Sequence, residues 1–273
     1  MSRWSAGNLV LLAGLAWPAL AETLVVQSAT SPRDSGWFAH VLPMAEQALD
    51  IDIQVIAVGS GQALKNAQRC DGDLLLTHAP AAETAFIKEG FGQARIALMN
   101  NPLVLIGPDD DPAAVAEFGS TREALQAIYQ TQHRFISRGD DSGTHAAERR
   151  LWQQAQRDPT RHSGDWYWQS GTGMGGVLNI AAETGSYALS DRASWIAFGR
   201  KQQHRILLQG LPELANPYHW VTLNPKHCPG ARHQSANRLI AWFQTQAGQQ
   251  AVESHRFEGL PLFTVPSSNM ENK

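Results

Sequence analysis

A polar segment in the middle of the chain carries the residues best suited to chemistry. Ser137–His145 reads Ser-Arg-Gly-Asp-Asp-Ser-Gly-Thr-His, and it follows the apolar pair Phe135–Ile136. Apolar residues then recur at every fourth position from Ala147, which is a helical spacing. The pattern predicts a strand, a turn and the start of a helix, with Ser142 or Thr144 as the N-cap.

The residue types in this segment indicate a cradle for a tetrahedral oxyanion. The first N–H groups of a helix have no intrahelical partner, and the helix dipole adds positive potential there. Arg138 offers a planar fork of donors, while Gly139 and Gly143 let the backbone approach a ligand closely. We expect Arg138 to be the only full positive charge on the anion, with backbone donors from Gly143 and Thr144. The alternative is an ordinary capped loop with a solvated arginine.

Other predicted strands are followed by similar donors. Hydroxyl, glycine and histidine residues stand where helices begin, in Ser28–Ser31, Gly59–Gln62 and Thr77–Pro80, and none of these segments holds a carboxylate. Each could simply cap its helix, but ligands in such folds bind outside the carboxyl ends of the strands. We therefore expect Ser28, Thr30, Ser60, Gly61 and His78 to share one anion site with the central loop. A glycine-rich helix entry at Thr172–Gly176 adds Gly173 and Gly175 as weaker candidates.

Helices and strands alternate along the chain in a way that predicts an α/β fold. The expected order is strand Leu24–Gln27, helix Gly36–Leu49, strand Ile51–Val58, helix Gln62–Gln68, strand Asp73–Thr77 and helix Pro80–Glu89. This order predicts a parallel sheet covered on both faces. The chain then crosses to a second alternating region within Leu98–Pro108 and returns at Asn216–Tyr218, so two modest domains are expected.

The N-terminal segment and the net charge indicate in which compartment the protein acts and which class of partner it does not bind. Met1–Ala21 has a basic start, a short apolar stretch and an Ala-Leu-Ala cleavage site, which predicts a signal peptide and a soluble periplasmic protein. Without Arg3 the chain has 21 basic and 25 acidic residues, a net charge of −4, which argues against a nucleic-acid partner.

The cysteine and histidine residues predict a disulfide rather than a metal site. Cys70 and Cys228 are the two cysteines, and an exported protein permits a bond between them, which we expect. Neither their spacing nor that of the ten histidines fits a metal motif.

Several motifs in order resemble one known family, the periplasmic tungstate-binding proteins of bacterial importers (TupA type). The resemblance covers nearly the whole exported chain and rests on segments that match the family's patterns. These are Ser28–Ser31, Asp34–Gly36, Ala57–Leu64, His78–Pro80, Ser137–His145, Gly171–Gly175, Leu178–Ala181, Leu189–Arg192 and Asn216–Tyr218. One position departs from the family: the first segment reads Ser-Ala-Thr-Ser, so Ala29 lacks a hydroxyl and offers the ligand only its backbone N–H.

The resemblance implies a type II periplasmic binding protein fold, with two α/β lobes joined by two crossing strands and a ligand cleft between them. Residues 22–104 with 220–273 would form the first lobe and residues 105–219 the second. The resemblance also implies that a monomer without a cofactor holds tungstate through its oxygens and delivers it to the permease of an ABC importer. Molybdate, phosphate and sulfate are the alternative ligands. Phosphate-binding relatives have an aspartate where this chain has His78.

A serine hydrolase is the alternative from another class. Asp141-Ser142-Gly143 is similar to the nucleophile loop of trypsin-like proteases, and His145 follows closely. Those proteases are all-β, however, and the Gly-x-Ser-x-Gly elbow of α/β-hydrolases is absent around Ser142. The sequence therefore favours a binding protein, with no catalytic residue expected.

Overall fold

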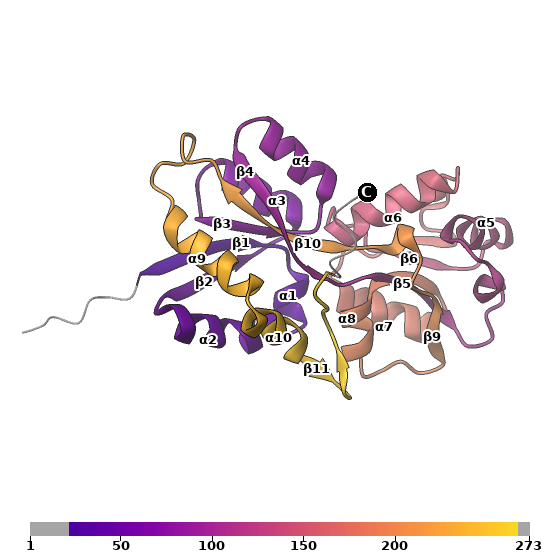
Figure 1. The fold of residues 1–273 in the computed structure, drawn as a ribbon. Coiled ribbons are helices and arrows are strands. Elements are labelled where there is room, and N and C mark those ends of the chain that lie inside the picture. The colour runs from indigo at the N-terminus through magenta and orange to yellow at the C-terminus, as the bar shows by residue number, and fades with distance from the viewer. Residues whose placement is uncertain (1–21, 267–273) are drawn as a thin grey trace, which may run out of the picture.

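Two five-stranded sheets, each covered by helices, form the two halves of the molecule (Figure 1). The structure is a computed structural model that describes residues 22–266. The predicted signal peptide, residues 1–21, lies outside the described residues. Among the described residues, no helix has the length and apolar character needed to cross a membrane.

The first sheet has the strand order β2-β1-β3-β10-β4. Its strands are β1 (Thr23–Ser28), β2 (Asp52–Ala57), β3 (Leu74–Thr77), β4 (Gly92–Asn100) and β10 (Pro217–Leu223). The helices around it are α1 (Ser31–Asp34), α2 (Trp37–Leu49), α3 (Ser60–Gln68), α4 (Pro80–Lys88), α9 (His233–Gln244) and α10 (Gln246–Ser254). Each predicted element of this half is present within one or two residues of its predicted bounds.

The second sheet has the order β7-β6-β8-β5-β9. Its strands are β5 (Leu103–Pro108), β6 (Phe135–Ser137), β7 (Tyr167–Gln169), β8 (Tyr187–Asp191) and β9 (His204–Leu208). Its helices are α5 (Thr121–Thr131), α6 (Gly143–Gln154), α7 (Met174–Thr184) and α8 (Arg192–Ala197), with short 3₁₀ turns η1 (Val115–Glu117), η2 (Pro159–His162) and η3 (Pro212–Leu214). A small hairpin, β11 (Arg256–Phe257) with β12 (Leu260–Pro261), follows α10.

Both sheets are mixed, which corrects the expectation of a purely parallel sheet. β10 runs antiparallel to both β3 and β4, and β5 runs antiparallel to both β8 and β9. These two strands are the ones that arrive from the other half of the molecule. Each enters its sheet at the edge where the neighbouring strands end, so it runs in the direction opposite to theirs.

The strand pairing changes from one sheet to the other at two places. β4 ends at Asn100 and β5 begins at Leu103, whereas β10 begins at Pro217 beside Asn100. The change thus falls two or three residues before the predicted bounds at 104/105 and 219/220. The division into lobes 22–104 with 220–273 and 105–219 stays a prediction, and we use "first lobe" and "second lobe" for the two sheets with their helices.

The polar loops of both lobes lie at the edges where the chain crosses. The ends of β1, β2 and β3 are level with the start of β10, as the pairs Ser28 with Ala57 and Thr77 with His219 show. In the second lobe the end of β8 pairs with the start of β5 through Asp191 and Leu103. The loops after all these strands therefore face the junction between the lobes, in the middle of Figure 1.

Each lobe has its own apolar core. Trp37, Trp220 and Phe243 are central to the first lobe, while Trp152 and Tyr187 are central to the second. Ile196 on α8 packs into the core of the first lobe. Burying large aromatic side chains supplies most of the stabilising free energy of such cores.

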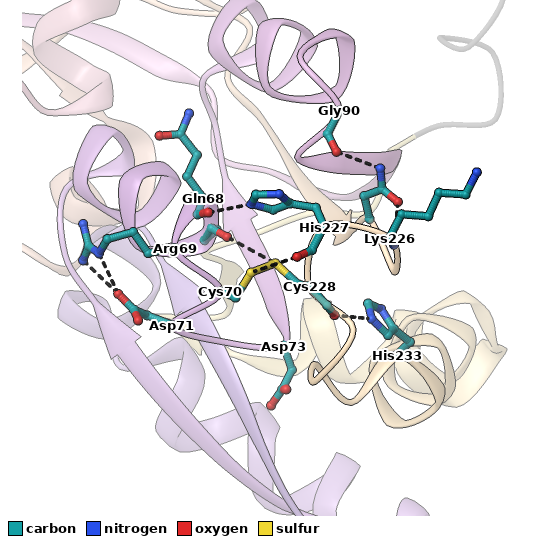
Figure 2. Close-up of a disulfide and its surroundings, with 12 residues drawn as sticks. Gln68, Arg69, Cys70, Asp71, Asp73, Gly90, Lys226, His227, Cys228 and His233 are labelled. Atoms are coloured by element: carbon teal, nitrogen blue, oxygen red, sulfur yellow. Dashed lines mark hydrogen bonds and ion pairs between the residues drawn. A yellow bond between two sulfur atoms is a disulfide. The ribbon is translucent and has the colours of Figure 1, made fainter.

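A disulfide joins Cys70 and Cys228, which confirms that prediction (Figure 2). Cys70 follows α3 and Cys228 lies between β10 and α9, so both cysteines belong to the first lobe. The bond spans 158 residues of sequence and links the two segments of the chain that build this lobe. Beside it, the ring of His227 contacts Gln68 O at 2.8 Å. Constraining so long a loop stabilises a fold by about 4–5 kcal/mol in the entropic model.

Candidate anion-binding site

The loop before α6 is shaped to direct the start of this helix at the junction of the lobes. Gly139 and Asp141 have left-handed backbone conformations, with φ of 59° and 55°. A side chain at Gly139 would also press on Gln169, because a Cβ there would lie 2.9 Å from Gln169 Cβ. Ser142 is the N-cap, since its Oγ accepts from His145 N at 3.3 Å. Of the two predicted caps, Thr144 is therefore excluded; it is a buried residue of the first turn.

Arg138 is buried but is not an isolated charge. The residue is 5% exposed, and its Nε donates to Asp140 Oδ2 at 3.1 Å, with a second hydrogen bond from Nη2 to the same oxygen. Partial burial raises the pKa of Asp140, but hydrogen bonds from Arg138 and Ser142 outweigh this and hold it below its usual value. The two charges balance each other. That Arg138 is the only full positive charge on the anion stays a prediction, and the structure adds Asp140 as a negative charge in contact with it.

A buried glutamate supports this loop from behind. Glu148 on α6 is 2% exposed; its Oε2 accepts from Arg138 N at 3.3 Å, and its Oε1 accepts from Tyr167 OH at 2.6 Å. Burial raises the pKa of Glu148 to about 7, against the opposing effect of the Tyr167 hydrogen bond. The carboxyl group therefore changes its protonation near neutral pH while it holds the backbone of Arg138.

His78, from the first lobe, meets the start of α6. Its ring stacks on Tyr218 with centroids 4.5 Å apart, and its Nδ1 lies 2.8 Å from Asn216 Oδ1. A Cβ on Gly143 would lie 2.4 Å from His78 Cε1 and 2.5 Å from Nε2. Only glycine fits at this position, because the imidazole occupies the space where any side chain would begin. The two lobes thus touch through His78 and Gly143.

The hydrogen bond to Asn216 decides which ring nitrogen of His78 carries a proton. Asn216 Nδ2 donates to Asn101 O at 2.8 Å, so the amide oxygen Oδ1 is the atom that faces His78. His78 Nδ1 must then donate, and Nε2 of the neutral ring has a lone pair. Burial lowers the pKa of His78, with Asn216, Asp191 and Glu83 acting in the opposite direction.

A second buried glutamate holds the His78 loop. Glu83 on α4 is fully buried, and its Oε1 accepts from Thr77 Oγ1 at 2.7 Å and from Ala79 N at 2.9 Å. Its other oxygen lies 3.0 Å from His219 Nδ1. The residues on both sides of His78 are therefore fixed to one carboxylate.

The other predicted donors of the first lobe differ in availability. Ser28 Oγ donates to Ala29 O at 2.9 Å, and Ala29 N donates to Leu76 O at 3.0 Å, so the sheet takes up both groups. The expected backbone donor at Ala29 is thus not free here. Thr30 caps α1 without a side-chain hydrogen bond to that helix.

Ser60 is one of the buried donors of the first lobe that have no partner among the described residues. It begins α3, is 3% exposed, and its Oγ is buried with no partner among the described residues. Buried hydroxyls are normally hydrogen-bonded, so this one indicates a missing acceptor. Gly61 follows in the same first turn and leaves open space where a side chain would stand.

The glycine-rich loop before α7 is tied to the Arg138 loop. Gly171 N donates to Arg138 O at 2.9 Å, and Ser170 Oγ donates to the same oxygen at 3.2 Å. Gly173 is the N-cap of α7 and Gly175 lies in its first turn; both are exposed, with open space where a side chain would stand. The loop lies at the same sheet edge as Arg138.

A chain of side-chain amides at the two crossings was not predicted from the sequence. Asn101 Nδ2 donates to Asp191 Oδ1 at 2.8 Å, and Asn101 O accepts from Asn216, which in turn holds His78. Asp191 also caps α8, since its Oδ1 accepts from Ser194 N at 2.9 Å. The Asn-Pro pairs at both crossings were the available signal for this network.

These features describe a two-lobe α/β binding protein with polar donors gathered between its lobes. The model of the PBP superfamily domain matches residues 17–246. The chain is 33% identical over 246 residues to the tungstate-binding protein TupA of Peptoclostridium acidaminophilum, covering 89% of this chain and 85% of that protein.

Solved structures give the same result. TupA from Desulfovibrio alaskensis G20 is 37% identical with a TM-score of 0.81, covering 90% of this chain and all of that one. The tungstate ABC transporter structure from Geobacter sulfurreducens is 39% identical with a TM-score of 0.75, covering 85% and 98%. The chain belongs to the PBP superfamily and, within it, to the TupA family.

Proposed function

We propose that this chain binds a tetrahedral oxyanion dianion, tungstate, between its two lobes. The observation that carries the proposal is the meeting of His78 with Gly143, which brings the start of α6 and the buried Arg138 against the first lobe. Free N–H groups of a helix start and a guanidinium suit an oxyanion. The unpaired hydroxyl of Ser60 supports an acceptor in the same region.

The choice of tungstate is supported by the relatives whose names state that ligand. Molybdate has nearly the same size and charge, so it is the second candidate. Phosphate and sulfate are weaker candidates. An aspartate at position 78 would accept the proton that phosphate carries near neutral pH, whereas this chain has a histidine there.

The arrangement of Ser142 favours binding over hydrolysis. Its Oγ accepts from the backbone of His145, and His145 Nδ1 accepts from Asp141 N at 3.0 Å. A nucleophilic serine needs a base within hydrogen-bond reach of its Oγ. The serine acts instead as a helix cap.

The place of the chain in transport follows from the same proposal. Residues 1–21 would direct export to the periplasm and be removed, and the remaining chain would act as a monomer. It would deliver its anion to the permease of an ABC importer, with no cofactor of its own and no nucleic-acid partner.

Calorimetric titration of the ligand-stripped protein with tungstate, molybdate, sulfate and phosphate tests the proposal. We expect tungstate, and molybdate less tightly or equally, to bind at one site per chain, and phosphate not to compete at neutral pH. Small-angle scattering should give a smaller radius of gyration with tungstate, because both lobes contribute donors. Binding of phosphate as tight as that of tungstate would overturn the assigned ligand class.

A further inference from the structure

The ring of His78 presents an acceptor, not a donor, to the anion site when it is neutral. Its Nδ1 proton is committed to Asn216 Oδ1, and the orientation of that amide is fixed by Asn101 O. Its Nε2 lies next to Gly143, the first residue of α6, where a Cβ would come within 2.5 Å of it. A lone pair is therefore directed at the place where the N–H groups of α6 gather.

A fully ionised oxyanion cannot occupy that place favourably beside a lone pair. Tungstate and molybdate carry no proton to share with Nε2, so an acceptor facing their oxygens repels them. Arg138 does not compensate, because Asp140 already balances its charge. A dianion entering this site would thus lack a net positive partner unless another group gained charge.

We propose that His78 takes up one proton at Nε2 when the oxyanion binds, and that the resulting imidazolium is a determinant of which oxyanions are held. This inference rests on the proposed function. The step is a simple protonation: solvent or buffer supplies the proton, Nδ1–H stays on Asn216, and the new Nε2–H donates to a ligand oxygen. The ring then changes from repelling to attracting the anion.

The surroundings of the ring are compatible with this change. Burial lowers the pKa of His78, so the ring is neutral before the ligand arrives. Asp191 from β8 and Glu83 from α4 raise its pKa, while Arg138 from the second lobe lowers it. The α6 entry also holds Asp140 and His145. A dianion added to this set favours the protonated ring.

Two other groups near the site can also exchange protons. Their contributions to the proton uptake therefore have to be distinguished from that of His78. Glu148 has a pKa of about 7, and burial together with Arg149 lowers the pKa of His145. Each has a non-titrating replacement that keeps a polar side chain. Glu148→Gln and His145→Asn therefore serve as matched controls, since each removes one titrating group and leaves His78 in place.

Calorimetry in buffers of different ionisation enthalpy measures the proton uptake directly. At about pH 7.5, above the usual pKa of histidine, tungstate binding should take up about one proton per anion. The affinity should fall by up to about tenfold per pH unit on going to higher pH. In His78→Asn, whose amide still donates to Asn216, the uptake should drop close to zero. Most of it should remain in both control variants.

Nitrogen NMR of the imidazole gives an independent reading in the unmodified protein. Both ring nitrogens of His78 should take imidazolium shifts when tungstate is added. Tungstate binding without proton uptake, an unchanged uptake in His78→Asn, or a neutral ring in the complex would each overturn the inference while leaving anion binding intact. Absence of binding by every oxyanion would overturn the proposed function, and this inference with it.

Discussion

The His78 loop and the Arg138 loop are held by the same device in opposite lobes. In each case a buried glutamate on the following helix reaches back to the backbone of the loop: Glu83 accepts from Ala79 N, and Glu148 accepts from Arg138 N. They differ in their other partners. Glu83 lies 3.0 Å from His219, whereas the second partner of Glu148 is the neutral hydroxyl of Tyr167.

The neutral partner of Glu148 matters for the protonation of this residue. A carboxylate without a cationic partner loses its hydration and gains little in return, so burial raises its pKa, as for Glu148. Each lobe thus supports its loop with a buried glutamate, and the glutamate of the second lobe titrates near pH 7. Four substitutions test what each loop contributes.

The largest effect is expected from Arg138→Ala. Removal of the guanidinium leaves Asp140 unpaired beside a dianion, and losses of this kind are about 2–5 kcal/mol, or about 30- to several-thousand-fold in affinity. Calorimetry with tungstate measures the change. Arg149→Ala is the control, since this arginine lies on α6, the helix that follows the Arg138 loop, with its side chain 58% exposed. Tungstate affinity of Arg138→Ala within a factor of two of wild type would show that the loop holds no ligand.

Glu83→Ala should destabilise the first lobe. Thr77 Oγ1 and Ala79 N would both lose their acceptor, and unsatisfied buried donors cost about 1–3 kcal/mol each. Urea unfolding should therefore show a loss of about 2–6 kcal/mol. The exposed Glu89 at the end of the same helix is the control, and Glu89→Ala should change the stability by less than about 0.5 kcal/mol. Equal effects of both substitutions would mean that the loop does not depend on Glu83.

Glu148 should make the stability depend on pH. Its pKa is raised from 4.5 to about 7 in the folded state, so the folded protein keeps a proton that the unfolded chain has lost. The contribution is complete below about pH 4.5 and is lost as the pH rises to about 7, in total about 3 kcal/mol. Urea unfolding across this range should show the decline in wild type and a flatter profile in Glu148→Gln. The same slope in both proteins would contradict the assignment.

Gly143→Ala should weaken binding without harming the fold. The new Cβ would lie 2.4 Å from His78 Cε1, so the lobes could not meet as they do here. Overpacking of this kind costs about 1–3 kcal/mol, or about 5- to 150-fold in affinity. The melting temperature of the ligand-free protein should not fall, since alanine favours helix more than glycine. Gly199→Ala, which meets no atom within 4 Å, is the control. Unchanged affinity in Gly143→Ala would show that closure does not need this contact.

Local patterns were sufficient to predict most of the elements. The alternation in Ile51–Val58 and the helical spacing after Gly143 are properties of short segments, and β2 and α6 follow them. The sequence also contained Cys70 and Cys228, and an exported chain with two cysteines favours their bond. The mixed sheets could not be predicted in this way, because strand direction depends on where β5 and β10 enter.

The sequence by itself determined the donors: Arg138, Ser142 and the glycines before α6, which short-range backbone chemistry places at a helix start. The tertiary structure decided how those donors are used. Asp140 neutralises Arg138, the sheet occupies Ala29 N, and Asn216 fixes the proton of His78 from 138 residues away. Charge balance and tautomer depend on which groups become neighbours after folding, and spacing along the chain does not contain that information.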